Sequence, residues 1–363
     1  MDPVKPDYRG AWVGGLVPAL LDGSAPAWLP EPVVGADQVV LLVLDGLGWR
    51  AIVDHRPPTL SAMVGGPIAT VAPSTTAAAL TSITTGLPPA AHGLVGYRIR
   101  VGGSLLNVLS WTASGDRGAP LPDPEAVQVA PPFRGRRVPV VTRVEFDRSG
   151  FTRAHLRGAA LIGWHTPATL VEHVRRLVAA GEPLVYAYSD GVDRVAHAYG
   201  LRDEFFAAEV AAADRLVARL LDALPETAAL LVTADHGQVH VDPADLVPLY
   251  PVLPLVSAVS GEGRFRSLHA ASGAAERLHE AALDRFGERA WVFRRDELFD
   301  EGWLGDGAGP AVRGRVGDVV LAAKGTWSFV DPGDPQEAGM LARHGSLTRD
   351  EVEVPLLAAR GTR

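Results

Sequence analysis

Residues 39–44 (VVLLVL) constrain the fold of this chain more than any other stretch. Six apolar residues follow one another without a polar interruption and stop at Asp45-Gly46. Such a run is typical of a strand that is buried on both faces and ends in a turn. In an open parallel sheet the ligand crevice lies at the carboxyl ends of the strands, so Asp45 is placed to reach a metal ion or a substrate.

Two later stretches repeat this pattern of an apolar strand that ends in acids. Residues 184–189 lead to Asp190 and Asp193, and residues 230–234 lead to Asp235-His236. An acid that merely caps a strand turn explains any one of these stretches, but several together indicate a shared site. Helices are predicted between the strands by start and stop signals, at 166–181 and at about 203–224. This alternation predicts an α/β fold with a doubly wound, mostly parallel central sheet and helices on both faces.

The composition narrows the classes of partner and of chemistry. The chain has 363 residues, 47% of them hydrophobic, which is enough for a large core. Its net charge of −8 offers no basic field for a nucleic acid duplex or an anionic membrane. There is no cysteine, so any metal ion must be held by Asp, His or hydroxyl oxygen. No signal peptide or membrane span is recognisable, which favours a cytoplasmic protein. The oligomeric state is left open.

The pattern changes between residues 242 and 314. A Pro-rich stretch is followed there by a predicted helix at 274–286 and a short strand at 290–293. We interpret residues 242–314 as a small inserted α/β lobe, a cap that shapes specificity. The catalytic core is then residues 1–241 together with 315–363, and it is expected to resume with a buried strand at 316–323 and to finish with a strand at 352–357.

A cluster of hydroxyl groups precedes a predicted helix. A strand at 67–72 is expected to end at Pro73, and Ser74-Thr75-Thr76 then leads into AAALTSITTG, which Gly86 ends. The free N–H groups and the dipole of a helix N-terminus favour an anion such as phosphate. The alternative is that Ser74 or Thr75 merely caps the helix.

Acids and histidines occur with spacings that suit metal ions. Asp193 and His197 are four residues apart and can grip one ion from a helical turn. Asp235-His236 are adjacent at a strand end, and His344 lies in a late loop. Carboxylates with imidazoles suit zinc, and with Asp45 the set is too large for one tetrahedral ion but fits two. The other histidines are interpreted as surface or core residues, with His55 unassigned: His155, His165, His173, His240, His269 and His279.

These motifs, in this order, resemble the alkaline phosphatase superfamily, and most of all its nucleotide pyrophosphatase/phosphodiesterase branch. The resemblance runs from residue 39 to residue 357, and it rests on five separated motifs: Asp45; Pro73 to Thr76 with Thr85-Gly86-Leu87 and His92-Gly93; Asp193 with His197 and Gly200; Asp235-His236-Gly237; and His344-Gly345. It implies one zinc ion on Asp193, His197 and His344. A second zinc ion is implied on Asp45, Asp235 and His236 together with the nucleophile, with manganese or iron as alternative metals.

The nucleophile implied by the resemblance is a threonine. Counting back from Thr85-Gly86-Leu87 places it at Thr76, with Thr75 as the rival if the register differs by one residue. Zinc lowers the pKa of such a hydroxyl and stabilises the departing oxygen, so a phospho-threonine intermediate is expected. His92 is structural in this pattern.

The sequence departs from the family pattern at one substrate-binding position. The family has an asparagine there that binds a phosphoryl oxygen, whereas this chain has Tyr97. Either the Tyr97 phenol donates the equivalent hydrogen bond or Asn107 reaches in from the next segment. The residues that bind a nucleotide in the family are therefore not all present in this sequence. Ligands for a third metal ion, which monoesterases of this superfamily use, are not recognisable, and this favours diester cleavage. The sequence motif of the sulfatases that share this fold is also absent.

The sequence thus predicts a di-zinc hydrolase that cleaves phosphodiester or pyrophosphate bonds in small, nucleotide-like phosphate esters. Within the same superfamily, the alternatives are a phosphomonoesterase, a phosphomutase-like enzyme and a phosphonate-cleaving enzyme. A catalytically inactive binding protein of this fold is a lesser alternative, because all the expected ligands and the nucleophile are present.

Overall fold

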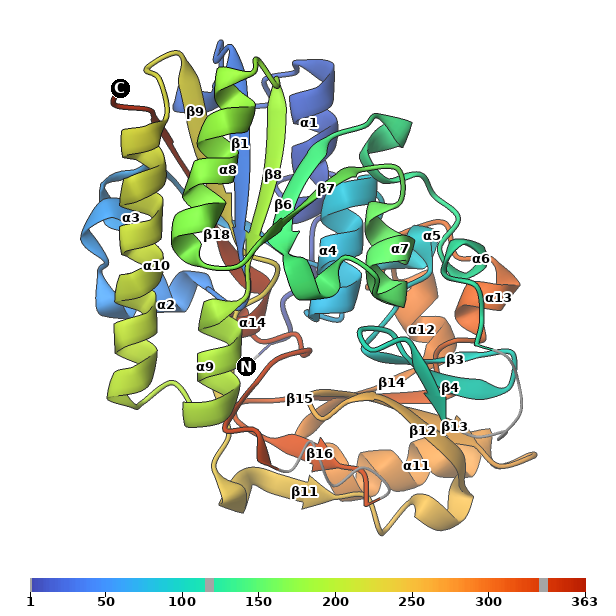
Figure 1. The fold of residues 1–363 in the computed structure, drawn as a ribbon. Helices are drawn as coiled ribbons and strands as arrows, with labels where there is room; N and C mark the ends of the chain where they lie inside the picture. Colours follow the sequence, from blue (N-terminus) through green and yellow to red (C-terminus); the bar gives the residue numbers. More distant parts are fainter. Residues whose placement is uncertain (1, 115–120, 333–338) are drawn as a thin grey trace.

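The computed structural model describes residues 2–114, 121–332 and 339–363, and it is built around a seven-stranded sheet (Figure 1). The strand order is β2-β18-β9-β1-β8-β6-β7. Strand β18 runs antiparallel to β2 and β9, and the other neighbouring strands pair in parallel. The bounds are β1 Gln38–Leu44, β2 Val64–Ala69, β6 Pro139–Arg143, β7 Ala160–Trp164, β8 Leu184–Ser189, β9 Ala228–Thr233 and β18 Glu353–Arg360. The predicted mostly parallel α/β sheet is confirmed.

Strand β1 lies at the centre of this sheet, with its apolar side chains buried on both faces. It pairs with β8 up to Leu44↔Ser189 and with β9 up to Val43↔Thr233, so the three strands end at nearly the same level. Because the strands are parallel, the acids that follow them emerge together at one edge of the sheet. This register explains why residues far apart in the sequence meet in one site.

Helices cover both faces of the sheet (Figure 1). On one face, the long helix α10 packs against α8, α9, α3 and α2; on the other, α4 packs against α1 and α7. Their bounds are α1 Leu16–Asp22, α2 Trp49–His55, α3 Pro58–Ala62, α4 Thr76–Thr85, α7 Gly150–Leu156, α8 Pro167–Ala179, α9 Gly191–Tyr199 and α10 Glu204–Ala223. The doubly wound arrangement is therefore present, and the predicted helices at 166–181 and 203–224 are confirmed to within a few residues.

A second sheet lies below the carboxyl edge of the first one in Figure 1. Its strand order is β12-β13-β15-β14, all antiparallel, and it packs on helix α11 over a separate hydrophobic cluster. Its bounds are β12 Val256–Glu262, β13 Phe265–Ala270, β14 Ala290–Arg294, β15 Val319–Ala323 and α11 Ala275–Phe286.

The expectation that the core sheet resumes at 316–323 is wrong. Strand β15 lies between β13 and β14 in the second sheet, so the lobe's sheet draws on residues beyond 314. The run VVLAA is as apolar as a core strand, and its hydrophobicity alone does not reveal which of two sheets buries it. Among the described residues beyond the lobe, β18 alone returns to the main sheet.

Short elements connect and flank the two sheets. The smaller strands are β3 Arg98–Val101, β4 Ser104–Asn107, β5 Thr112–Ser114, β10 Val239–His240, β11 Leu246–Pro248, β16 Ser328–Val330 and β17 Ala342–Arg343. The short α-helices are α5 Pro89–His92, α6 Pro124–Val127, α12 Arg295–Asp300, α13 Pro310–Arg313 and α14 Arg349–Val352. Within the described residues, none of the helices combines the length and apolarity that crossing a lipid bilayer requires.

The strand predicted at 67–72 is shifted in the structure. Strand β2 starts at Val64 and ends at Ala69, since Val64, Gly65 and Gly66 pair with β18. Two consecutive glycines are weak strand formers, and only the pairing with β18 holds them extended. The expected helix after Thr76 is confirmed as α4, which ends before Gly86 in a left-handed conformation.

Candidate active site

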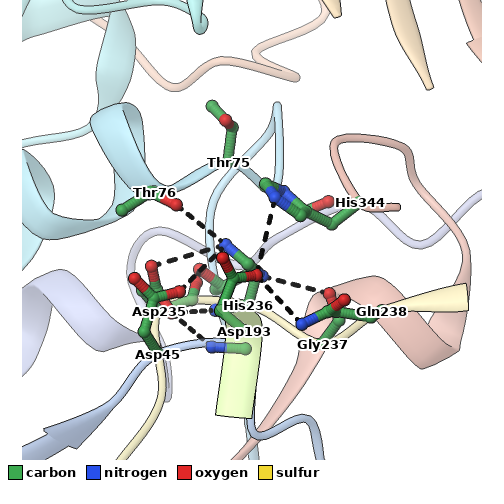
Figure 2. Close-up of polar contacts among 12 residues, drawn as sticks. Asp45, Thr75, Thr76, Asp193, Asp235, His236, Gly237, Gln238 and His344 are labelled. Atoms are coloured by element: carbon green, nitrogen blue, oxygen red, sulfur yellow. Dashed lines mark hydrogen bonds and ion pairs between the residues drawn. The ribbon is translucent and has the colours of Figure 1, made fainter. Parts of the chain in front are cut away.

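Acids from two adjacent strand ends meet at the carboxyl edge of the main sheet (Figure 2). Asp45 follows β1 and Asp235 follows β9, while Asp193 lies in the first turn of α9. The turn at Gly46 has a φ of 73°, and a Cβ there would lie 3.0 Å from the Asp193 Cα. Glycine is therefore required for the β1 turn and α9 to approach this closely.

One group of possible metal ligands consists of Asp193, His197 and His344. The Nε2 atom of His197 lies 3.3 Å from one Asp193 oxygen, and the Nε2 atom of His344 lies 3.9 Å from the other. One ligand atom from each of the three residues lies within 4.8 Å of the others. The resemblance implied these same three residues as the ligands of one zinc ion, and they lie close together in the structure.

A second group lies beside the first one and contains Asp45 and His236. His236 Nε2 lies 3.5 Å from Asp45 Oδ1 and 3.4 Å from Asp235 Oδ2. Asp193 also offers an oxygen to this group, within 4.8 Å of the ligand atoms of Asp45 and His236. The resemblance implied Asp45, Asp235 and His236 for the second zinc ion. His236 lies close to both of these acids, but the group of ligand atoms within 4.8 Å of one another contains Asp193 in place of Asp235.

The three histidines present the same nitrogen to these carboxylates. The Nδ1 atoms of His197, His236 and His344 lie 2.7, 3.1 and 3.0 Å from the backbone oxygens of Ala342, Gly237 and Ser74, respectively. A backbone carbonyl can only accept, so each Nδ1 donates to it and each Nε2 is the nitrogen that faces the acids. Metal-binding histidines in proteins are held in this way.

Two buried carboxylate oxygens are free to coordinate a cation. Asp45 Oδ2 accepts from the Tyr188 hydroxyl, and Asp235 Oδ1 accepts from the backbone N–H groups of Gly46 and His236. The remaining oxygens, Asp45 Oδ1 and Asp235 Oδ2, are buried without a hydrogen-bond partner among the described residues. An orphaned buried carboxylate oxygen is costly unless a cation coordinates it, so the donor set suits divalent metal ions.

The pKa shifts of the cluster also indicate a site for divalent metal ions. Burial, and then the charges of Asp235 and Asp193, raise the pKa of Asp45 well above its ordinary value. Burial also raises the pKa of Asp235. Burial alone would lower the pKa of His197, but Asp193 raises it to about 9, so a proton lies between these two residues in the metal-free protein. A metal ion that binds there must displace this proton.

The structure separates the two candidate threonines (Figure 2). Thr76 Oγ1 lies 3.0 Å from His236 Nε2, whereas the Thr75 hydroxyl points away and donates to Glu262 Oε2 at 2.7 Å. Thr75 occupies the N-cap position of α4, but its side chain makes no capping hydrogen bond. Ser74 donates to the backbone oxygen of Ser346 instead. The first-turn N–H groups of α4 are thus left uncapped by Ser74 and Thr75, beside Thr76.

Two pockets diverge from Thr76 and Asp193. The larger has a volume of about 510 Å³ and is also lined by Asp45 and by apolar side chains of β8, α4 and α7. The smaller has a volume of about 210 Å³ and is also lined by His197, His344 and, from the lobe, Glu262. A substrate whose phosphorus lies at Thr76 can therefore direct one substituent into each pocket.

Tyr97 and Asn107, the two predicted substrate-binding residues, lie next to each other. Asn107 Nδ2 donates to the Tyr97 hydroxyl at 2.7 Å, and Asn107 Oδ1 accepts from the backbone N–H groups of Leu109 and Ser110. Tyr97 lines the smaller pocket. In this arrangement Asn107 orients the Tyr97 phenol, while Tyr97 is the one that faces the pocket.

Sequence reasoning missed three residues that support the site. Tyr188 donates to Asp45, Gln238 donates to Asp193 Oδ1 at 2.9 Å, and Glu262 accepts from Thr75. Tyr188 precedes Asp190 by two residues, and Gln238 follows His236 by two residues. Their closeness in the sequence to the predicted ligands could have indicated that they support the site. Glu262 belongs to the lobe, and nothing in the sequence links it to Thr75.

The histidines interpreted as structural include two that are deeply buried. His92 lies on α5, with its Nε2 3.0 Å from Ser82 Oγ and its Nδ1 accepting from the N–H of Leu94. His155 stacks on Phe151 with ring centroids 3.9 Å apart. Burial lowers the pKa of His92 to about 3 and that of His155 to about 4, so both rings are neutral core residues.

Comparison with known proteins agrees with this geometry. Residues 39–347 match the family described as Type I phosphodiesterase / nucleotide pyrophosphatase. No curated protein matches the sequence.

Several solved structures share the fold. Murine ectonucleotide pyrophosphatase/phosphodiesterase 5 is 15% identical, with a TM-score of 0.67, over 90% of this chain and 88% of that one. An inactive threonine-to-alanine variant of the murine protein, in complex with AMP, is 15% identical, with a TM-score of 0.66, over 88% and 87%. Phosphonoacetate hydrolase from Sinorhizobium meliloti, in complex with phosphonoformate, is 19% identical, with a TM-score of 0.61, over 90% and 91%.

Proposed function

Because the chain belongs to the Type I phosphodiesterase / nucleotide pyrophosphatase family of hydrolases, we propose that it cleaves phosphodiester or pyrophosphate bonds of small substrates through a covalent intermediate on Thr76. The observation that carries this proposal is the position of the Thr76 hydroxyl, 3.0 Å from His236 Nε2, where the two ligand groups meet. The membership also confirms the resemblance to the alkaline phosphatase superfamily.

The proposed cofactors are two zinc ions, one for each ligand group. Asp193, His197 and His344 would hold one ion, and Asp45, Asp235 and His236 would hold the other together with Thr76. When bound, such ions lower the pKa of the hydroxyl and stabilise charge on the leaving oxygen. The carboxylate and imidazole donors suit zinc better than calcium or magnesium, which prefer oxygen ligands alone.

The residues of the chain account for the remaining steps. The Thr76 hydroxyl gives up its proton to solvent, and its oxygen forms a bond to phosphorus while the bond to the leaving oxygen breaks, which gives a phospho-threonine. The uncapped N–H groups of α4 are placed to donate to the nonbridging oxygens, and the Tyr97 phenol is a further donor in the smaller pocket. The oxygen of a water molecule then forms a bond to phosphorus and loses a proton, while the bond to the Thr76 oxygen breaks and that oxygen regains its proton.

A nucleotide is one substrate that the comparisons support. The murine relative is described as bound to AMP, and its inactive variant lacks a threonine, which agrees with a threonine nucleophile. The larger pocket offers room for the organic part of such a molecule.

The proposal is tested with bis-p-nitrophenyl phosphate and p-nitrophenyl phosphate, each with and without a chelator. We expect turnover of the diester that chelation abolishes and zinc restores. Thr76→Ala should reduce kcat by at least about a thousandfold, since it removes the nucleophile, while the bound zinc remains. The matched control is Thr84→Ala on the same helix, where the hydroxyl donates only to backbone oxygens of α4. A strong preference for the monoester would favour a phosphomonoesterase, and no turnover of either ester would contradict the proposal.

A further inference from the structure

A third pocket, of about 500 Å³, lies between the β3–β4 hairpin and the lobe (Figure 1). It shares no lining residue with the two pockets of the candidate active site. Arg100 lines it from β3, Arg295 lines it from the start of α12, and Arg315 lines it from the segment before β15. The backbone N–H of Arg100 donates to the carbonyl of Arg315 at 3.2 Å, so the two segments are in direct contact at this pocket.

Positive charge exceeds negative charge in the wall of this pocket. The three arginines Arg100, Arg295 and Arg315 line it together with a single acid, Asp318. Both oxygens of this acid are engaged, because Oδ1 lies 3.2 Å from Arg295 Nη1 and Oδ2 accepts from the backbone N–H of Ala270 at 2.8 Å. The whole chain has a net charge of −8, so this excess of cations is a local feature and does not follow from the composition.

Two of these arginines have no carboxylate partner among the described residues. The side chain of Arg100 is exposed and forms neither a hydrogen bond nor an ion pair with them. Arg315 donates through Nη1 to the backbone oxygens of Gly93 and Val127, at 2.7 and 3.0 Å, and its Nε and Nη2 atoms have no partner in the described part of the chain. Burial lowers the pKa of Arg315, as expected for a cation whose charge no neighbouring acid offsets.

His269 shows the electrostatic effect of these cations. Its ring is buried in the pocket wall, with Nε2 2.9 Å from Ser260 Oγ. Burial, and then the charge of Arg100, lower the pKa of His269 to about 4. The positive potential that opposes protonation of this ring would attract an anion to the same place.

We propose that this pocket binds the phosphoryl group of a dianion, either inorganic phosphate or a small organic phosphate monoester, with Arg100, Arg295 and Arg315 as its ligands. Guanidinium groups match phosphate oxygens in geometry, and hydrogen bonds between charged partners are the strong ones. The two charges of such a dianion offset the two arginines that lack a carboxylate partner. This site is separate from the candidate active site and does not depend on the proposed function.

An anion in this pocket would connect the core to the lobe. Arg100 belongs to β3, which packs on β12 of the second sheet, whereas Arg295 begins α12. In the absence of an anion the arginines repel one another, and a shared ligand converts this repulsion into attraction. Because a ligand of the folded state stabilises that state, binding should raise the thermal unfolding midpoint.

The test is a calorimetric titration of the zinc-loaded protein with inorganic phosphate and, separately, with phenyl phosphate. Both ligands can also enter the candidate active site, so variants identify the pocket. Arg100→Ala removes a cation from an exposed position and should raise the Kd of this site at least about fivefold, and Arg100→Glu should raise it further. Arg277→Ala, at an exposed position of α11 outside the pocket, is the matched control and should bind like the wild type.

The outcomes separate the source of the phosphoryl group and the two sites. Tighter binding of phenyl phosphate to the pocket would assign an organic monoester as the ligand, and equal or weaker binding would assign inorganic phosphate. Phosphate should raise the unfolding midpoint of the wild type more than that of Arg100→Glu, while turnover of bis-p-nitrophenyl phosphate stays the same in Arg100→Ala. Identical isotherms for the wild type, Arg100→Ala and Arg100→Glu, with all three proteins folded, would overturn the proposal and leave the proposed function intact.

Discussion

The imidazole rings of His236 and His344 stack with centroids 3.6 Å apart and planes inclined by 12°. They belong to different ligand groups, and Asp193 offers an oxygen to both groups. Burial, followed by the charge of His236, lowers the pKa of His344 well below its ordinary value, so this ring is neutral and ready to coordinate. The two ligand groups therefore have the Asp193 carboxylate in common, and one histidine of each group stacks on a histidine of the other.

This sharing predicts different zinc contents for two single variants. His344→Ala removes a ligand of one group and should leave about one zinc ion per chain. Asp193→Ala removes an oxygen from both groups and should weaken both sites, so its zinc content falls below that of His344→Ala. The measurement is metal analysis after dialysis against a weak chelator. His165→Ala, at an exposed position, is the control and should keep the full content. Equal zinc in both variants would show that Asp193 does not serve two ions.

A second prediction concerns the contact between the lobe and the nucleophile segment. Glu262 accepts the Thr75 hydroxyl at 2.7 Å and holds the residue before Thr76 in place. Glu262→Ala should lower kcat for bis-p-nitrophenyl phosphate by about tenfold through misplacement of Thr76, with little change in KM. Glu262→Gln keeps an accepting oxygen and should recover most of the loss. If the Ala and Gln variants were equally impaired at unchanged zinc content, the charge of Glu262, and not its hydrogen bond, would be what matters.

Much of the site could be predicted from the sequence because its ligands follow strand ends. Asp45 and Asp235 are each preceded by an apolar run, and parallel pairing of those runs brings the two acids together. The four-residue spacing of Asp193 and His197 survives as one turn of α9. In these segments the hydrophobic pattern predicts the strands correctly, and parallel pairing of the strands is enough to bring the ligands together.

What the sequence did not reveal depends on contacts between distant segments. Strand β15 has the composition of a core strand, and only its pairing with β13 and β14 assigns it to the lobe. The choice between Thr75 and Thr76 was open because both hydroxyls precede the same helix. The partners of these hydroxyls, Glu262 and His236, decide which one faces the acids.

A third prediction concerns acid stability through His92. Burial lowers its pKa from 6.5 to about 3, so between these values the unfolded chain binds a proton that the folded chain does not. The free energy of unfolding should therefore fall as the pH falls below about 6.5, by about 1.4 kcal/mol per pH unit from this group. Urea unfolding of the chelated protein and of His92→Gln, at several pH values, isolates this contribution as a difference. Glutamine supplies one donor and one acceptor for Ser82 and Leu94 without titrating. Parallel curves for the two proteins would contradict the prediction.

A fourth prediction separates two tyrosines of the same strand. Tyr186 is 2% exposed, and among the described residues its hydroxyl has no hydrogen-bond partner, whereas the Tyr188 hydroxyl donates to Asp45. Tyr186→Phe removes an unsatisfied polar group but keeps the ring that meets Phe133 edge to face at 5.9 Å. We expect the free energy of unfolding to rise by about 1 kcal/mol.

Tyr188→Phe is the matched comparison for this change. It deprives Asp45 of a hydrogen bond and should lower both stability and zinc affinity, because Asp45 is then held less firmly beside His236. Thermal unfolding of the two variants in the presence of a chelator measures the stability difference, and zinc titration measures the affinity. A loss of stability in Tyr186→Phe would show that an internal water molecule satisfies the Tyr186 hydroxyl in solution.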